Sequence, residues 1–403
     1  MTKTVAVIGT MDTKGEEFAF LISALKRLNI NPLVINTGVL GEALTAVDID
    51  AATLAEAAGS DLASLRSAND RGAAMHTMAK GASIVVKKLY DEGRFDGIIG
   101  MGGSGGSSVV SAAMRSLPIG VPKLLISTMA GGDVSAYVGS SDIIMMPSIV
   151  DVAGINRISR GVFTRAAGAI AGMVQAEVVS DGQDKPLIAA SMFGNTTEAV
   201  NTARAFLEAK GYEVLVFHAT GAGGRSMEHL IESGFIAGSL DITTTEWADE
   251  LTGGILSAGP HRLEAAAKTG TPQIVVPGCI DMANFGGEET VPPHYKDRNL
   301  YVWNPAVTLM RTTVEENTQL GRIFAEKLNA ATGPVRVLIP LRGFSILDSP
   351  GQRFWDPEAD GAFIASLKAN LRSDIPVEEH DLNINDQAFA ERCAQALLEM
   401  LEA

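Results

Sequence analysis

The chain has only two cysteines among its 403 residues, Cys279 and Cys393, and they lie far apart in apolar surroundings. A disulfide framework is therefore not expected, and a reducing, cytoplasmic setting is the natural one. No apolar run approaches the roughly 20 residues that cross a bilayer. The first apolar run, TVAVIG, is short and leads directly into a predicted helix, so we do not interpret it as a secretion signal.

Basic residues are also scarce, with 32 Lys and Arg against 47 Asp and Glu, a net charge of −15. Such a charge disfavours nucleic acids and membrane surfaces as partners, because both are polyanions. A small anionic ligand is still possible, since it needs only a local positive potential. The sequence also has no His/Cys cluster with zinc spacing and no Walker A loop.

Short apolar runs alternate with stretches of helical period, which is typical of a parallel sheet covered on both faces. Strands are expected at 4–9, 31–38, 95–103, 122–132 and 142–148, and later at 272–278, 300–305 and 335–341. The polar stretch 180–186 indicates a boundary, and the order strand, turn, helix, strand of residues 5–38 then recurs in 186–221. We predict two Rossmann-like, doubly wound α/β domains with mainly parallel sheets, residues 1–183 and 184–403. The repeated pattern suggests an old duplication.

The turn after the first strand, GTMDTKGEE, carries acids where a phosphate cradle would be expected. Thr13 and Glu16 have the spacing of a capping box, which predicts that they cap the next helix. Asp12 could hold Mg²⁺, or it could contact a ribose, while Lys14 offsets part of the acidic charge.

The turn after the third strand, GMGGSGG, has no acid near it and is rich in glycine. Glycines let the backbone approach a ligand, and free N–H groups at a helix start attract anions. A tight packing turn would need fewer glycines, so we favour an anion site. A further turn, STMAGGD, ends the fourth strand. Because the carboxyl ends of parallel strands share one edge, the three turns predict one pocket. Its expected cofactor-binding residues are Thr10, Asp12, Thr13, Lys14, Gly102, Gly103, Ser104, Gly105, Gly106, Thr128, Ala130 and Gly131, with Asp12 as the metal ligand.

These turns, together with PSIVDVAGINRISR, DITTTEWADEL, PGCIDMANF, LMRTTVEEN and SPGQRFWDPEAD, resemble an uncharacterised family of ATP-binding proteins that are similar to a tomato mosaic virus resistance protein. The resemblance covers essentially the whole chain. It implies two Rossmann-like subdomains, ATP with Mg²⁺, and self-association into a homo-oligomer. In plants the module is fused to a TIM-barrel domain, so the resemblance also suggests a separately encoded barrel partner for this chain.

In the second half, Glu246, Asp281 and Arg342 follow apolar strands or open Pro/Gly-rich loops, and we take them as candidate catalytic residues. Glu246 would be a general base or metal ligand, although helix capping would also explain its position. Arg342 could grip a carboxylate or phosphate in bidentate fashion.

Three functions stay open on these residues. The first is an ATP-dependent enzyme acting on a small anionic metabolite in a cleft between the domains. The second is a nucleotide-responsive assembly protein without turnover. The third is a pocket for another phosphate-bearing ligand, such as coenzyme A or a sugar phosphate.

Overall fold

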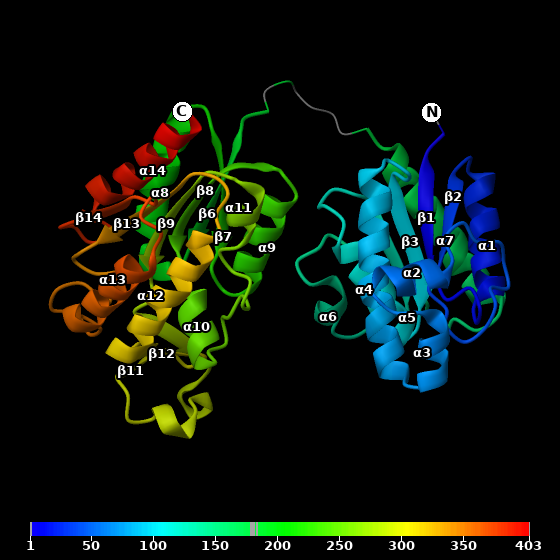
Figure 1. The fold of residues 1–403 in the computed structure, drawn as a ribbon, viewed down its shortest axis with the longest axis horizontal. Helices are drawn as coiled ribbons and strands as arrows, with labels where there is room; N and C mark the ends of the chain where they lie inside the picture. Colours follow the sequence, from blue (N-terminus) through cyan, green and yellow to red (C-terminus); the bar gives the residue numbers. More distant parts are fainter. Residues whose placement is uncertain (1, 178–181, 183, 403) are drawn as a thin grey trace. The chain divides into compact units, whose positions relative to one another are not determined.

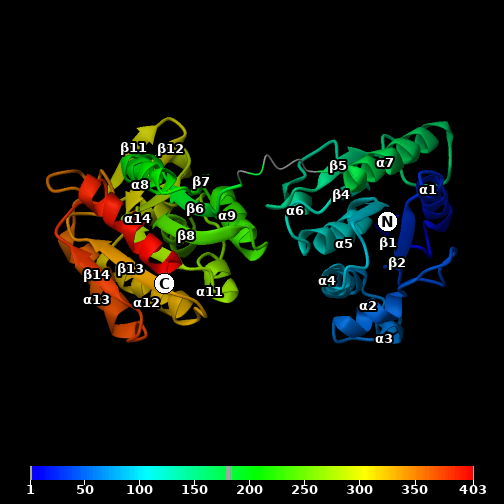
Figure 2. The same ribbon diagram turned by 90° about the horizontal axis from the view of Figure 1, so that it is seen from above.

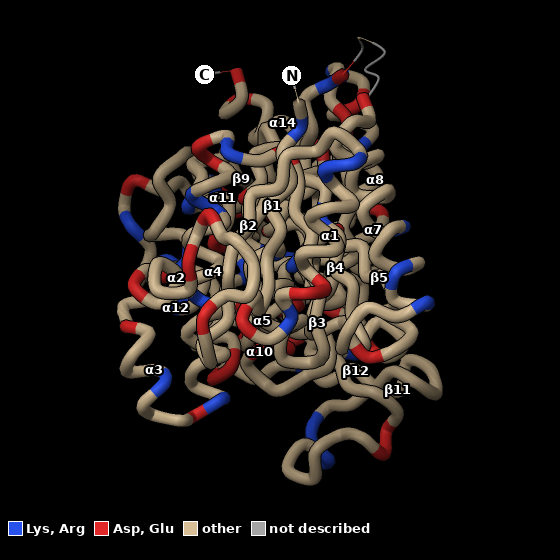
Figure 3. The backbone as a smooth tube through the Cα atoms, turned by 90° about the vertical axis from the view of Figure 1, so that its right-hand side faces the viewer, with Lys and Arg blue, Asp and Glu red and all other residues tan. Residues whose placement is uncertain are grey.

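The computed structural model describes residues 2–177, 182 and 184–402, and the chain divides into two compact units, residues 1–179 and 180–403. The stretch expected to hold the boundary, 180–186, falls partly outside the described residues. Acidic and basic residues are interspersed along the tube in both units (Figure 3).

The first unit is built on a five-stranded parallel sheet in the order β2-β1-β3-β4-β5. Its strands are β1 (Thr4–Gly9), β2 (Asn31–Asn36), β3 (Gly97–Gly102), β4 (Lys123–Ser127) and β5 (Ile144–Pro147). Its helices are α1 (Gly15–Arg27), α2 (Ala51–Ala57), α3 (Leu62–Ala68), α4 (Arg71–Asp91), α5 (Ser104–Arg115), α6 (Ser135–Val138) and α7 (Arg157–Gln175).

Helices cover both faces of this sheet (Figures 1 and 2), and an apolar cluster lies under the helices of each face. Phe18 and Leu21 of α1 pack with Phe163 of α7 on one face, whereas α2, α4 and α5 cover the other. Gly100 of β3 is required for this packing, because a Cβ there would lie 2.5 Å from Val110 of α5. The helix after β1 and the helix after β3 thus leave the sheet on opposite sides.

The second unit has a six-stranded parallel sheet in the order β14-β13-β9-β8-β6-β7 and a separate antiparallel ribbon in the order β10-β12-β11. Its strands are β6 (Leu187–Met192), β7 (Glu213–His218), β8 (Ile236–Thr243), β9 (Gln273–Gly278), β10 (Met282–Phe285), β11 (Leu300–Asn304), β12 (Val307–Arg311), β13 (Val335–Pro340) and β14 (Val377–His380). Its helices are α8 (Thr197–Ala209), α9 (Ala222–Glu232), α10 (Glu246–Thr252), α11 (Ala265–Thr269), α12 (Val314–Asn329), α13 (Pro357–Asn370) and α14 (Gln387–Leu401).

Counted from β6, the first five strands of this sheet repeat the spatial order of the first unit, and β14 is added at the edge. The prediction of two doubly wound α/β units with mainly parallel sheets is therefore confirmed. The strand expected at 300–305 exists as β11, but it pairs with β12 in the antiparallel ribbon rather than in the parallel sheet.

The start of α1 corrects one local prediction. Thr13 and Glu16 do not form a capping box, because the helix begins at Gly15 with Lys14 as its N-cap residue. The N–H of Lys14 closes a turn on the carbonyl of Thr10 (2.9 Å), and the Thr13 hydroxyl bonds that of Thr10 (3.1 Å). This extra turn delays the helix and leaves residues 10–14 as a loop beyond the sheet edge.

Candidate functional site

A cavity of about 590 Å³ lies at the carboxyl ends of β1 and β3 in the first unit. The strand order reverses between these two strands, which is where doubly wound sheets bind their ligands. The cavity is lined by Thr10, Asp12, Thr13, Lys14, Thr37, Gly38, Val39, Leu40, Leu65, Arg66, Asn69, Asp70, Arg71, Ala74, Met75, Met78, Gly102, Gly103, Ser104, Gly105, Gly106, Val109 and Asp151. The structure thus brings together the predicted residues of the first and third turns.

The glycine-rich turn leads into α5, whose N-cap residue, Gly103, makes no side-chain cap. Among the described residues, no acceptor pairs with the N–H groups of Ser104, Gly105 or Gly106, and the first helical bond at this end runs from Ser107 to the carbonyl of Gly103 (2.8 Å). Three unpaired amides at the positive end of a helix form an anion-binding site, which we call the anion seat.

The same turn has the Gly-x-Ser-x-Gly spacing of a nucleophile elbow. The structure disfavours that reading, because Ser104 is not among the residues with positive φ. Among the residues that the structure describes, no histidine lines the cavity either. Ser104 therefore starts a regular helix rather than a strained nucleophile turn.

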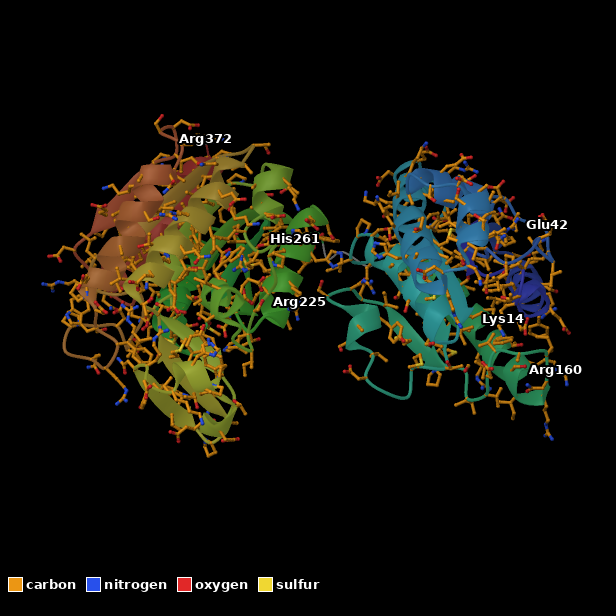
Figure 4. The ribbon with its side chains drawn as sticks, turned by 60° about the horizontal axis from the view of Figure 1, so that its bottom comes forward. Lys14, Glu42, Arg160, Arg225, His261 and Arg372 are labelled. Carbon is orange, nitrogen blue, oxygen red and sulfur yellow. The ribbon has the colours of Figure 1, made fainter. Side chains whose placement is uncertain are left out.

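Two cations face the cavity without a protein partner. Lys14 lies at the amino end of α1 (Figure 4), and Arg71 is the first residue of α4, with its Nη2 3.5 Å from the position of a Cβ built on Gly105. Within the described part of the chain, neither side chain makes a hydrogen bond or an ion pair. Arg66 differs, because it donates to the carbonyls of Val39 (2.6 Å) and Gly41 (3.0 Å).

Two of the acids that line the cavity, Asp12 and Asp70, are engaged by the protein itself. Asp12 Oδ2 accepts the N–H groups of Leu40 (2.8 Å) and Gly41 (3.2 Å), which ties the turn to the loop after β2. Asp12 Oδ1 is buried without a partner. Asp70 caps α4 by accepting the N–H of Ala73 (3.0 Å). Only one oxygen of Asp12 is thus free for a cation, and no cluster of three or more His, Cys, Asp or Glu is arranged for a metal in the described ranges.

Apolar side chains form the rest of the wall. Met78 and Val109 are buried, and Leu65 and Met75 pack against the same core. The cavity therefore joins a polar, cation-lined end to an apolar wall. Sequence reasoning missed Leu65, Arg71 and Met75, because nothing in the local pattern places α3 and α4 over this edge.

The third predicted turn, residues 127–133, borders a separate hollow rather than the cavity itself. Thr128 and Gly131 line a neighbouring hollow of about 520 Å³, and Ala130 lies in the same turn. Asp151 lines both spaces. The three turns therefore share an edge of the sheet, as predicted, but they border two compartments.

The second unit places Glu246 inside an ion-pair network. Glu246 is 1% exposed, and its Oε1 accepts the N–H groups of Gly221 (2.7 Å) and Gly224 (3.0 Å) at the start of α9. Its Oε2 accepts from Nε of Arg262 (2.7 Å), which also pairs with Asp241. Burial opposes the charge of Arg262, but the surrounding carboxylates outweigh it and hold its pKa above the usual value. This geometry favours a positioning role for Glu246, and its catalytic role stays a prediction.

Asp281 lies in a second buried network. Burial raises its pKa to about 6, its Oδ2 accepts from the Ser345 hydroxyl (2.8 Å), and its Oδ1 has no partner. The nearby guanidinium of Arg311 is held by Asp348 and Asp360. Burial raises the pKa of both of these carboxyls.

Arg342 is largely exposed and pairs with Asp381 (3.0 Å) at the surface. The three candidate catalytic residues follow adjacent strands, β8, β9 and β13, but each has its own set of partners. Their joint action in one active site stays a prediction.

Two family models cover almost the whole chain. The N-terminal domain of the uncharacterised protein family UPF0261 matches residues 3–178, and the C-terminal domain of that family matches residues 185–401. The chain belongs to family UPF0261. A UPF0261 protein of Clostridium tetani is 49% identical over all of both chains, and one of Rhizobium meliloti is 45% identical over 98% of each.

The expected likeness to the tomato protein is also found. The ToMV resistance protein Tm-1(GCR237) of Solanum lycopersicum is 39% identical over 98% of this chain and 55% of the plant protein. Among solved structures, a UDP-N-acetylglucosamine 2-epimerase is 10% identical over 99% of this chain and 95% of its own, with a TM-score of 0.26. So low a score supports no argument about function. Within the described residues, no helix of this UPF0261 member has both the length and the apolar character that a membrane crossing needs.

Proposed function

We propose that the first unit binds ATP together with Mg²⁺ in the 590 Å³ cavity. The observation that carries the proposal is the pairing of this anion seat with an apolar wall in one space. The amides of residues 104–106, Lys14 and Arg71 provide the seat, and Leu65 and Met75 belong to the wall. A nucleotide needs both, because its phosphates are charged and its base is flat and apolar.

The residues present also fit a magnesium ion. Mg²⁺ is commonly held by one or two carboxylates plus substrate phosphates and water. The free Oδ1 of Asp12 is a suitable first ligand, since its other oxygen is fixed by two backbone amides. The bound metal would neutralise phosphate charge beside the acids of this turn.

Calorimetry on the full chain tests the site. We expect ATP with Mg²⁺ to bind more tightly than coenzyme A or a sugar phosphate. Ser104→Asp adds a carboxylate to the anion seat, where two like charges 4 Å apart repel by about 4 kcal/mol at an effective dielectric constant of 20. The affinity for ATP should therefore fall by at least about 100-fold.

Ser108→Asp is the matched control, because Ser108 is exposed one turn further along the same helix and does not line the cavity. It should change the affinity by less than about threefold. Unchanged affinity in Ser104→Asp would show that the phosphates do not bind at this turn. Tighter binding of coenzyme A would assign the same cavity to a different phosphate-bearing ligand.

A further inference from the structure

The hollow beside the ATP cavity lies at the carboxyl ends of β4 and β5. It is lined by Ser127, Thr128, Gly131 and residues 147–151, and its volume is about 520 Å³. That volume lies within the range of small-molecule sites. Because Asp151 lines both spaces, the two compartments meet at one carboxylate.

The loop that carries Asp151 is fixed at both ends. At its start, the N–H of Ser148 donates to the carbonyl of Ser127 (3.1 Å). At its far end, the N–H of Gly154 donates to the buried carboxylate of Glu17 in α1. Asp151 itself is exposed, and within the described residues it makes no hydrogen bond or ion pair. A rigid loop thus presents an unpaired carboxylate at the junction of two cavities.

Ile149 on this loop has a φ of 67° and is 75% exposed. A β-branched residue rarely adopts positive φ, and such strain is concentrated at binding and catalytic loops. The strained backbone holds an apolar side chain at the edge of the hollow, where it could cover a ligand.

In the described part of the chain, the residues that line the hollow provide hydroxyl groups and one carboxylate but no Lys, Arg or His. Among the described residues of this lining, the only charged side chain that an anion would meet is Asp151, which would repel it. A hydroxyl or an ammonium group could instead donate a hydrogen bond to that carboxylate.

We propose that this hollow binds a neutral or cationic small molecule bearing hydroxyl or amino groups, which Asp151 holds beside the nucleotide. That this small molecule is a second substrate rests on the proposed function, whereas its binding in the hollow does not. The proposal differs from the anionic substrate expected from the sequence, because Arg342 lies in the other unit.

Methyl-detected NMR of the full chain, isotope-labelled at Ile, Leu and Val, tests both compartments separately. Leu65 reports on ATP with Mg²⁺, and Ile149 reports on the hollow. The probes are glycerol, glucose, ethanolamine and choline, with succinate as the anionic comparison. We expect saturable shifts at Ile149 with at least one hydroxyl or amino compound and none with succinate.

Asp151→Asn should weaken that binding at least tenfold, while Leu65 still responds to ATP. Asp133→Asn is the control, because Asp133 is exposed in the neighbouring turn and does not line the hollow. If no probe shifts Ile149, if succinate binds there more tightly, or if Asp151→Asn has no effect, the second compartment is not what we propose. If ATP with Mg²⁺ does not shift the methyl signals of Leu65, that result would instead contradict the nucleotide site.

Discussion

Replacing Glu246 by alanine distinguishes a structural from a catalytic carboxylate. The native side chain accepts three hydrogen bonds, from the N–H groups of Gly221 and Gly224 and from Arg262, and it is almost completely buried. Glu246→Ala removes all three at once. It leaves two helix amides without an acceptor and Arg262 with fewer counter-charges.

Breaking a buried ion pair by removing one partner costs about 3–5 kcal/mol. Arg262 keeps its bonds to Asp241 (2.6 Å) and Glu228 (2.9 Å), so we expect the lower part of that range, about 3–4 kcal/mol. For a unit of this size, each kcal/mol lowers the melting temperature by about 2–4 °C. The expected fall is therefore about 6–16 °C.

Urea unfolding followed by tryptophan fluorescence measures this effect selectively, because Trp247, Trp303 and Trp355 all lie in the second unit. Glu232→Ala serves as the control: Glu232 ends α9, is half exposed, and pairs only loosely with Lys268 (3.8 Å). An exposed pair of this kind contributes less than about 1 kcal/mol. A loss below about 1 kcal/mol in Glu246→Ala would refute the structural role and restore the prediction of a general base.

Two further predictions address the first turn and the response to pH. A Cβ on Gly38 would lie 2.0 Å from Asp12 Oδ1, so Gly38→Ala should displace that carboxylate and weaken ATP·Mg²⁺ binding about tenfold in calorimetry. Gly41→Ala is the control, because there is space for its Cβ, and it should change the affinity by less than about twofold. Equal effects of the two substitutions would contradict the role of Asp12. Burial raises the pKa of Asp249 from 3.8 to about 7, so the folded state holds this proton more tightly than the unfolded chain. The contribution of this proton to the free energy of unfolding is complete below about pH 4 and declines by about 4 kcal/mol as the pH rises to 7. Asp249→Asn should flatten the dependence of the free energy of unfolding on pH, measured by urea unfolding at several pH values. An unchanged dependence would assign it to other groups.

The sequence was most informative where a pattern is local. Strands β1 and β9 are continuous apolar runs, and both were located to within about a residue or two, the usual uncertainty of element ends. Strand β8 was missed because Ser239 and Asp241 interrupt its apolar pattern. Those polar groups are tolerated inside because Arg262, far along the chain, neutralises Asp241. No local sequence pattern predicts that Arg262 pairs with Asp241.

In the candidate site, too, the parts formed by consecutive residues were predictable and the parts formed by distant elements were not. The glycine-rich turn at 102–106 could be identified because an anion seat is encoded by consecutive residues. The cation Arg71 and the junction residue Asp151 reach the cavity from α4 and from the loop after β5. Their placement depends on how distant elements pack, which the local pattern of a single sequence does not specify.

The repeated strand order sets up an asymmetry between the units. The helix that follows the third strand begins with Ser104 in the first unit and with Glu246 in the second. Through Glu246, the second unit supplies a permanent carboxylate to the amides at the start of α9, the helix that follows its second strand, β7. Among the described residues of the first unit, no carboxylate accepts the amides at the start of α5, so the stability of the first unit should depend on the concentration of a diffusible anion, whereas the amides of α9 need none.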